Sequence, residues 1–226
     1  MTPRSAAAAV VPAAGVGERL GAGVPKALRL LAGEPLIVHA VRALVVAGVE
    51  TVVVASPADT VSQVEQLLGP VTAAAALAVV PGGLTRRESV AACLAALPDD
   101  AEVVLVHDAA RPLVPEAVVR RVLGELANGA EAVVPAVRVA DTVKEVTAGH
   151  VVRTVDRSAL RAVQTPQGFR RAVLARAHAD WRGPEPSDDA AMIEALGVPV
   201  RVVDGAAEGF KITGPLDLRL AQIICS

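Results

Sequence analysis

The amino-acid sequence predicts a single α/β domain in which a mostly parallel sheet is flanked by helices. Short apolar runs rich in valine and alanine alternate with longer amphipathic segments, which is typical of strands connected by crossover helices. A glycine-rich loop follows the first of these runs, as expected where a strand leads into a helix. The length of 226 residues suits one large domain, and no linker or repeat divides it.

The expected strands and helices follow one another in a regular order. Each expected strand is a short β-branched or alanine-rich run, and each expected helix carries apolar residues at helical spacing. The strand and helix segments are 6–11 and 35–48, 51–56 and 58–69, 76–83 and 86–97, and 102–108 and 115–126, followed by a strand at 130–137. This alternation predicts one sheet with helices on its faces.

The pattern changes in residues 138–161, where polar and apolar residues alternate around a turn at 147–150. This is typical of a hairpin-like arm that projects from the domain. Beyond the arm, the sequence predicts further elements up to the C-terminus. They are helices at 170–181, 188–197 and 215–225, with Pro215 in the first turn of the last helix, and extended segments at 198–205 and 209–213.

Composition excludes several classes of protein. The formal net charge is −2 and aromatic residues make up 1% of the chain, so nucleic acid would find neither a basic field nor a stacking surface. The first apolar run is short and interrupted by Pro12, which favours a core strand over a signal peptide, and no segment is long enough for a membrane span. We therefore expect neither a nucleic-acid nor a membrane partner.

The two cysteines point to a reducing compartment. Cys93 and Cys225 lie far apart and show no metal-binding spacing, so we expect both to be structural. The expected location is the cytoplasm.

The loop from Pro12 to Lys26 contains four glycines. Leu20 stands where a dinucleotide fingerprint needs its third glycine, and Lys26 lacks the neighbours of a Walker lysine, so both motifs fail. A nest of backbone N–H groups that binds a phosphate remains, with Arg19 and Lys26 as flanking cations. A tight turn without a ligand is the alternative.

Lysine is rare in this chain. The three lysines are Lys26, Lys144 and Lys211, whereas arginine is used almost everywhere else. A lysine supplies a compact point charge, so Lys26 and Lys211, which lie in loops or at strand ends, are candidates for anion contacts. Lys144 lies in the polar alternation of the arm and is expected to be a solvated residue, and chance placement remains the alternative for the others.

The end of the third expected strand offers a second candidate site. Gly82 and Gly83 are followed by Arg86 and Ser89 at the start of a helix, where an anion or the edge of a base could bind. Because the carboxyl ends of parallel strands meet at one edge of a sheet, these residues are expected near the glycine loop.

The fourth expected strand ends in His107, Asp108 and Arg111. Asp108 is either a ligand for a nucleotide-bound Mg²⁺ or the partner of Arg111 in a local ion pair. We expect His107 to be packed rather than to act as a base, and the sequence contains no Ser/His/Asp or Cys/His arrangement.

Eight motifs stand in order along nearly the whole chain: VVPAAGVGERL, VPKAL, GGLTRRESV, VHDAARP, ADTVK, TVDRSALRAVQTPQGF, DDAAMIEALG and FKITGPLDL. Together they resemble the 2-C-methyl-D-erythritol 4-phosphate cytidylyltransferases, enzymes of the non-mevalonate route to isoprenoid precursors. The resemblance implies one Rossmann-like nucleotidyltransferase domain over residues 1–226, with 138–161 as a protruding β-arm used in dimerisation.

The resemblance also implies a reaction. The family transfers CMP from CTP to 2-C-methyl-D-erythritol 4-phosphate with Mg²⁺ or another divalent cation, and its arms are shared between the active sites of a homodimer. Two alternatives remain open: a cytidylyltransferase for another polyol phosphate such as ribitol 5-phosphate, and a non-enzymatic module that binds CTP.

The family's functional residues carry over to matching positions of this chain. The implied catalytic residues are Arg19, Lys26, Arg157 and Lys211. The implied nucleotide-binding residues are Pro12, Ala13, Ala14, Gly15, Gly17, Gly82, Gly83, Arg86, Ser89 and Asp108. The implied acceptor-binding residues are Asp108, Arg111, Thr142, Arg157, Thr165 and Lys211, and Asp108 is also the implied metal ligand.

Two departures from the family pattern concern the surroundings of the lysines. Ala27 replaces a frequent glutamine, and EGFKIT replaces the commoner ENIKVT, which leaves the support of Lys211 open. Since the chain has no tyrosine, we expect Ser89 and backbone groups near Gly82 to read the cytosine by hydrogen bonds.

Overall fold

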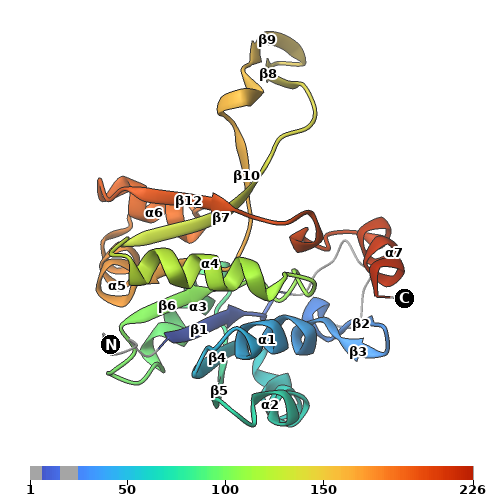
Figure 1. The fold of residues 1–226 in the computed structure, drawn as a ribbon, viewed down its shortest axis with the longest axis vertical. Helices are drawn as coiled ribbons and strands as arrows, with labels where there is room; N and C mark the ends of the chain where they lie inside the picture. Colours follow the sequence, from blue (N-terminus) through green and yellow to red (C-terminus); the bar gives the residue numbers. More distant parts are fainter. Residues whose placement is uncertain (1–6, 16–24, 226) are drawn as a thin grey trace.

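The computed structural model describes residues 7–15 and 25–225, and its centre is one eight-stranded sheet (Figure 1). The strand order is β10-β7-β11-β6-β1-β4-β5, and β12 pairs with β7. The parallel half contains β1 (Ala7–Pro12), β4 (Thr51–Ser56), β5 (Ala76–Pro81) and β6 (Val103–Val106). The four strands expected at 6–11, 51–56, 76–83 and 102–108 are confirmed.

The other half of the sheet mixes directions. Its strands are β7 (Ala132–Arg138), β10 (Arg161–Val163), β11 (Gln167–Arg170) and β12 (Val200–Asp204). Strand β11 runs antiparallel to both β6 and β7, β10 runs antiparallel to β7, and β12 runs parallel to β7. A small separate ladder joins β2 (Leu30–Leu31) to β3 (Glu34–Pro35).

Helices cover both faces of the sheet (Figure 1). They are α1 (Leu36–Val46), α2 (Val61–Leu68), α3 (Arg86–Ala95), α4 (Glu116–Ala127), α5 (Arg171–Asp180), α6 (Asp189–Ala195) and α7 (Pro215–Ile224). Within the described ranges, no helix has the length and apolar character that crossing a membrane requires.

Each face of the sheet has its own apolar core because neighbouring residues of a strand point to opposite sides. In β1, Ala9 and Val11 belong to the core beneath α1, α2 and α4, whereas Ala8 and Val10 belong to the core beneath α3, α5 and α6. All four side chains are buried. This two-sided burial fixes β1, and with it the point at which the glycine loop leaves the sheet.

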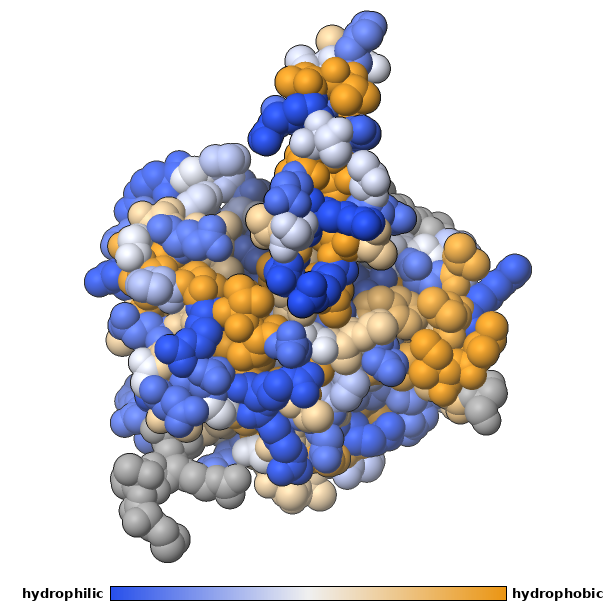
Figure 2. Space-filling model, turned by 45° about the horizontal axis from the view of Figure 1, so that its top comes forward, coloured by the Kyte–Doolittle hydropathy of each residue, from blue (hydrophilic) through white to orange (hydrophobic). Residues whose placement is uncertain are grey.

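Residues 138–161 form the expected arm. Strands β8 (Val143–Thr147) and β9 (His150–Val155) make an antiparallel hairpin that projects from the domain (Figure 1). Gly149 in its turn has a φ of 80°, a conformation that glycine adopts without strain. The arm carries the exposed apolar side chains of Val146, Val151 and Val152, and Figure 2 shows apolar residues along it among polar ones.

The C-terminal third differs from the expected pattern in two places. Residues 209–213, expected to be extended, follow the short helix η6 (Ala207–Gly209) and are assigned to no strand. Strands β10 and β11 escape the sequence pattern because they have only three and four residues. Strand β11 also contains Gly168, where a Cβ atom would lie 2.5 Å from Cγ1 of Val122.

Candidate active site

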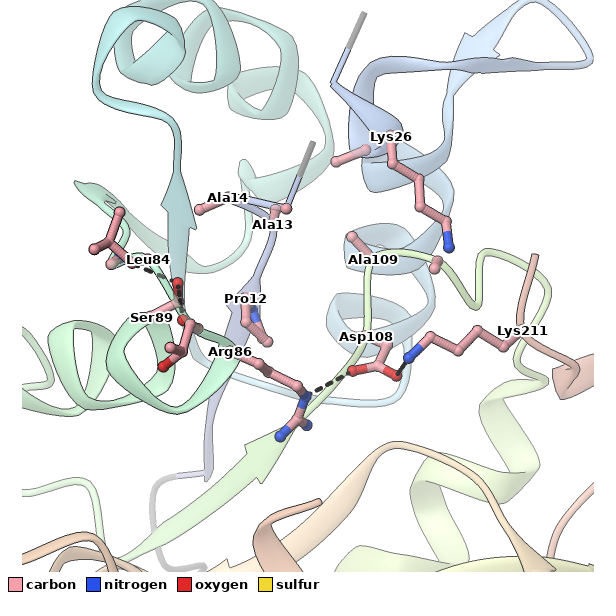
Figure 3. A pocket seen from close by; sticks show the side chains of 15 residues that line it. Pro12, Ala13, Ala14, Lys26, Leu84, Arg86, Ser89, Asp108, Ala109 and Lys211 are labelled. Atoms are coloured by element: carbon pink, nitrogen blue, oxygen red, sulfur yellow. Dashed lines mark hydrogen bonds and ion pairs between the residues drawn. The ribbon is translucent and has the colours of Figure 1, made fainter. Parts of the chain in front are cut away.

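Two adjoining pockets lie at the carboxyl ends of the parallel strands. The first has a volume of about 290 Å³ and lies between the loops after β1, β5 and β6 (Figure 3). The second has a volume of about 330 Å³ and lies between the loop after β6, residues 163–167 and the start of α6. Arg86, Asp108 and Lys211 line both pockets and therefore form their common boundary.

The glycine loop forms one wall of the first pocket, where residues 12–15 line it. The N–H of Ala13 donates to the carbonyl oxygen of Ala55 in β4 at 2.7 Å, which holds the start of the loop at the end of β1. The remaining predicted residues of this loop, Gly17 and Arg19, lie outside the described residues.

Lys26 lies on the opposite side of the first pocket from Leu84 and Ser89 (Figure 3). It begins the short helix η2 (Lys26–Leu28), in which the N–H of Leu28 donates to the carbonyl oxygen of Pro25 at 2.9 Å. Ala27, which stands where glutamine is frequent in the family, is buried against the core and also lines the first pocket.

Gly82 and Gly83 form a turn that no larger residue could make without rearrangement. A Cβ atom on Gly82 would lie 2.4 Å from Cβ of Ala14, and one on Gly83 would lie 2.3 Å from Cβ of Glu88. The contact with Ala14 brings this turn directly against the glycine loop. The two glycine segments thus meet at one pocket, as their positions at strand ends predict.

Ser89 and the start of α3 hold this turn in place. The Ser89 hydroxyl accepts a hydrogen bond from the N–H of Gly83 at 3.2 Å and donates to the carbonyl oxygen of Thr85 at 3.0 Å. Thr85 and Glu88 form a capping box, and Glu88 also accepts from the N–H of Leu84 at 2.7 Å. Since these N–H groups already have partners, this wall offers an anion chiefly the side chain of Arg86.

Asp108 occupies the centre of the boundary, surrounded by three cations. Its carboxylate oxygens lie 2.9 Å from Nζ of Lys211, 3.3 Å from Nε of Arg86 and 3.9 Å from Nε of Arg111. Burial by itself would raise the pKa of Asp108, but the charges of Arg86 and Lys211 outweigh it and hold this pKa well below its usual range. The cluster therefore combines an ionised carboxylate with an excess of positive charge.

Arg111 is fixed by backbone carbonyl groups. Its Nη1 donates to the carbonyl oxygen of Gly209 at 2.8 Å, and its Nη2 donates to that of Val163 at 3.4 Å. Burial, opposed by the charge of Asp108, lowers the pKa of Arg111 from its usual value, yet an arginine remains charged at neutral pH. One of the two alternatives for Asp108, an ion pair with Arg111, is present with Nε of Arg111 3.9 Å from Oδ2 of Asp108.

The backbone segment that carries Lys211 is held in place by its neighbours. The N–H of Ile212 donates to the carbonyl oxygen of Ala110 at 2.8 Å, which ties this segment to the loop after β6. Asp217 accepts hydrogen bonds from the side chain and backbone of Thr213 and from the N–H of Gly214, and these bonds lower its pKa. The departure in EGFKIT therefore leaves Lys211 supported.

Thr165, a predicted acceptor residue, lines the second pocket and contacts the buried His107. The Thr165 oxygen accepts a hydrogen bond from the N–H of Asp108 at 3.0 Å and lies 3.0 Å from Nδ1 of His107. Burial lowers the pKa of His107 to about 4, so the imidazole is neutral at physiological pH. The prediction of a packed histidine is confirmed.

Thr142 and Arg157 lie apart from this cluster. Both belong to the arm, are exposed, and are not among the described residues that line the two pockets. Arg157 donates a hydrogen bond to the carbonyl oxygen of Ala140, on the opposite side of the arm. The structure thus does not bring these two predicted acceptor residues to the pockets of their own chain.

Carboxylates suited to a metal ion are scarce. In the described part of the chain, no group of three or more histidine, cysteine or acidic residues could hold a metal ion. Asp108 is the only acidic residue among the described residues of the first pocket, and its three cations would compete with a metal. These residues fit Mg²⁺ only if most of its ligands are nucleotide oxygens.

Two acidic residues near the boundary were not singled out from the sequence. Asp188 lines the second pocket and caps α6 by accepting from the N–H of Ala191, and Asp189 accepts a 2.6 Å hydrogen bond from Nη1 of Arg86. The motif DDAAMIEALG does contain a recognisable pattern, in which an acidic pair precedes a helical apolar run. That pattern indicates a helix cap but not a tertiary partner.

Known proteins resemble this chain over nearly its whole length. A family model described as 2-C-methyl-D-erythritol 4-phosphate cytidylyltransferase matches residues 7–226. A protein of that name from Streptomyces coelicolor is 52% identical in an alignment 227 residues long that covers 96% of this chain and 84% of the relative. One from Nocardia farcinica is 50% identical over 218 residues, which cover 96% and 92% of the two chains.

Solved structures show the same architecture. The crystal structure of 2-C-methyl-D-erythritol 4-phosphate cytidylyltransferase from Thermus thermophilus is 39% identical, has a TM-score of 0.79 and covers 96% of this chain and 97% of its own. A synthase structure from Anaerococcus prevotii has a TM-score of 0.84 at 23% identity, covers 97% of both chains and supports the fold alone. The chain therefore belongs to the 2-C-methyl-D-erythritol 4-phosphate cytidylyltransferase family.

Proposed function

We propose that this protein transfers CMP from CTP to 2-C-methyl-D-erythritol 4-phosphate in isoprenoid biosynthesis. The products are 4-diphosphocytidyl-2-C-methyl-D-erythritol and pyrophosphate. Family membership supports the reaction, and relatives about half identical over nearly the whole chain carry the enzyme's name. The observation that carries the mechanism is the cationic cluster of Arg86, Arg111 and Lys211 where two pockets meet.

CTP is assigned to the first pocket and the acceptor to the second. The turn at Gly83 and Ser89 is the candidate contact for cytosine, while residues 12–15 and Lys26 face the triphosphate. The acceptor phosphate then lies beside Lys211 and Arg111, because these cations line the second pocket. In this arrangement the two reacting phosphates meet at the boundary of the pockets.

The nucleophile needs no general base. A phosphate monoester with a second pKa near 6 is largely dianionic at neutral pH, so its oxygen can attack the α-phosphate directly. The buried His107 suits this mechanism, because it contacts Thr165 and does not line the described pockets.

The main obstacle is repulsion between two anions. Negative charge builds on the α-phosphate and on the leaving pyrophosphate while a second phosphate approaches. At an effective dielectric constant near 20, one pair of charges at roughly 4 Å contributes about 4 kcal/mol. Lys26 and Arg19 are assigned to the triphosphate in this transition state, and Lys211 and Arg157 to alignment of the attacking phosphate.

A divalent cation such as Mg²⁺ would be held mainly by the phosphate oxygens of CTP. When bound there, it would neutralise the triphosphate and favour departure of pyrophosphate. Asp108 is the candidate protein ligand among the described residues of the first pocket. Its three ion-pair partners, Arg86, Arg111 and Lys211, instead favour direct contacts with phosphate oxygens.

The proposal includes a homodimer in which the arms complete each other's sites. A two-stranded hairpin is marginally stable alone in water, and this one exposes Val146, Val151 and Val152. Thr142 and Arg157 do not line the described pockets of their own chain, which supports delivery into the second pocket of a partner subunit. The cytoplasm is the proposed location, and Cys93 and Cys225, which form no disulfide, support it.

Pyrophosphate release from each of the four nucleoside triphosphates, measured with a panel of four- and five-carbon polyol phosphates, tests the proposal. The highest kcat/KM is expected with CTP and 2-C-methyl-D-erythritol 4-phosphate, and chelation of divalent cations should stop turnover. A higher kcat/KM with ribitol 5-phosphate would reassign the acceptor. Tight CTP binding without turnover on any acceptor would favour a binding module.

A further inference from the structure

An ionised carboxylate lies behind the boundary of the two pockets and has no part in the reaction described above. Asp189 is the first residue of α6 and is 0% exposed. One of its oxygens accepts a 2.6 Å hydrogen bond from Nη1 of Arg86, and the other lies 2.9 Å from Nε2 of His178. Asp189 is not among the described residues that line either pocket, so it is not placed to touch a substrate.

Asp189 and Arg86 form an ion pair in which both groups stay charged. Burial would raise the pKa of Asp189, but the hydrogen bond from His178 and the charge of Arg86 hold it below its usual value. Burial would likewise lower the pKa of Arg86, but Asp189 and Asp108 raise it above the usual value. Because a buried charge without a partner is strongly unfavourable, neither group is expected to leave the other.

Arg86 is anchored differently from the other cations around Asp108. Its Nη1 binds Asp189 while its Nε lies 3.3 Å from Oδ1 of Asp108, so one guanidinium bridges carboxylates from two separate elements. The planar fork of arginine suits such a bridge, whereas an ammonium is a single point charge. Among the described residues, Lys211 has an ion pair with Asp108 alone, and its side chain is 41% exposed.

This difference matters when the acceptor binds. A phosphate beside Lys211 competes with Asp108 for the ammonium group. Asp108 would then weaken its contact with its nearest cation while it remains almost buried. Arg86 can stay in place at that moment because Asp189 holds it from behind.

We propose that Asp189 is a positioning residue for CMP transfer: it fixes Arg86 against Asp108 while Lys211 moves to the acceptor phosphate. The alignment of the two substrates at the boundary is thereby preserved. This inference rests on the proposed function, since Lys211 is drawn away only if a phosphate-bearing acceptor binds in the second pocket.

The first test is Asp189→Asn, which keeps the shape of the side chain and removes its charge. Loosening of Arg86 should misalign the acceptor and lower kcat/KM for 2-C-methyl-D-erythritol 4-phosphate about 10²-fold. KM for CTP should change less than kcat/KM for the acceptor, because Lys26 and residues 12–15 also line the first pocket and are untouched, although Arg86 lines it too. Wild-type kcat/KM for the acceptor in a folded Asp189→Asn protein would overturn the proposal.

A double-mutant cycle separates positioning from a merely structural role. Arg86→Lys keeps a positive charge but cannot bridge both carboxylates. It should therefore lower kcat/KM for the acceptor as Asp189→Asn does, with a smaller change in KM for CTP. If Asp189 acts through Arg86, adding Asp189→Asn to Arg86→Lys should lower kcat/KM by less than about twofold. Losses that multiply would instead show independent roles and overturn the proposal.

Met192→Ala is the matched control for stability. Met192 lies on the same helix, is 1% exposed and belongs to the core beneath α6. At a temperature where it is folded, this variant should keep kcat/KM within about twofold of wild type despite its lower thermal stability. A loss as large as that of Asp189→Asn would assign the effect to the stability of α6 and overturn the positioning role.

The test remains decisive if Asp189→Asn does not fold. Arg86→Lys alone, with an unchanged circular dichroism spectrum, should still lower kcat/KM for the acceptor, and wild-type activity in this variant would overturn the proposal. Failure of the proposed function gives a different result, because the wild-type protein would then form no CDP-linked product at all.

Discussion

The Nζ of Lys211 lies 2.9 Å from Oδ2 of Asp108, and this ion pair joins the C-terminal segment to the loop after β6. The two partners differ in exposure, with the lysine side chain 41% and the aspartate side chain 11% exposed. The lysine can therefore turn toward an incoming anion, while the carboxylate stays among its other cations. This asymmetry marks the place where the acceptor phosphate is expected to bind.

Replacement of this lysine tests the acceptor side. Lys211→Ala should raise KM for the acceptor and lower kcat, with a total loss in kcat/KM of roughly 10²–10³, because one close charge pair is removed. CTP binding measured by calorimetry should survive. Lys144→Ala is the control, since Lys144 is an exposed lysine bonded to Thr154 on the arm. Loss of CTP binding in a folded Lys211→Ala protein would contradict the assignment.

Lys26 tests the stabilisation of the transition state. Lys26→Ala should lower kcat by roughly 10²–10³ and leave CTP affinity comparatively intact, as expected for a charge that acts mainly in the transition state. Arg19→Ala should behave similarly. Steady-state kinetics and CTP titration distinguish the outcomes: a normal kcat with only a raised KM for CTP would place Lys26 in ground-state binding.

Mixing of subunits tests the shared site. Inactive Lys26→Ala and Arg157→Ala chains are combined in equal amounts after reversible dissociation. If the arm of one subunit completes the site of the other, each mixed dimer contains one site free of both defects, and about a quarter of wild-type activity should return. If each chain builds its own site, no activity returns even when mass spectrometry confirms mixed dimers.

The buried histidine predicts a dependence of stability on pH. Because burial lowers the pKa of His107 to about 4, the unfolded chain takes up a proton below its ordinary pKa, near 6.5, while the folded protein does not. The free energy of unfolding should therefore fall between pH 8 and pH 5, with a contribution of about 2 kcal/mol from this group.

Urea unfolding across this pH range measures the effect. His107→Gln should flatten the dependence, whereas His150→Gln, which changes an exposed histidine of the arm, should not. Equal slopes for wild type and His107→Gln would show that His107 does not account for the acid-linked loss of stability.

Local pattern was sufficient to predict the parallel half of the fold. The run 51–56 coincides with β4, and the helical pattern at 115–126 differs from α4 by one residue at each end. The spacing of apolar residues within each of these segments is enough to identify it as a strand or a helix. Strand β11 does not, because it exists only by pairing with β6 and β7, and no spacing within its four residues indicates that.

The site residues likewise fall into those that the local sequence predicts and those that depend on tertiary contacts. Asp108 and Arg111 stand at a strand end, where topology predicts a ligand; Asp108 lies at the boundary of the pockets, and Arg111 lines the second pocket. The contact between Arg86 and Asp189 could not be predicted, since it joins residues 103 positions apart in the chain. The placement of Thr142 and Arg157 outside the described pockets of their own chain likewise depends on the path of the arm.

The direction of bond formation tests the central claim most directly. The acceptor, 2-C-methyl-D-erythritol 4-phosphate, is prepared with ¹⁸O in its non-bridging phosphate oxygens and incubated with the protein, Mg²⁺ and unlabelled CTP. If an acceptor oxygen attacks the α-phosphate of CTP, mass spectrometry and ³¹P NMR should find all the label in the CDP-linked product, including its new bridge, and none in pyrophosphate. Label in pyrophosphate, or no CDP-linked product, would contradict the account.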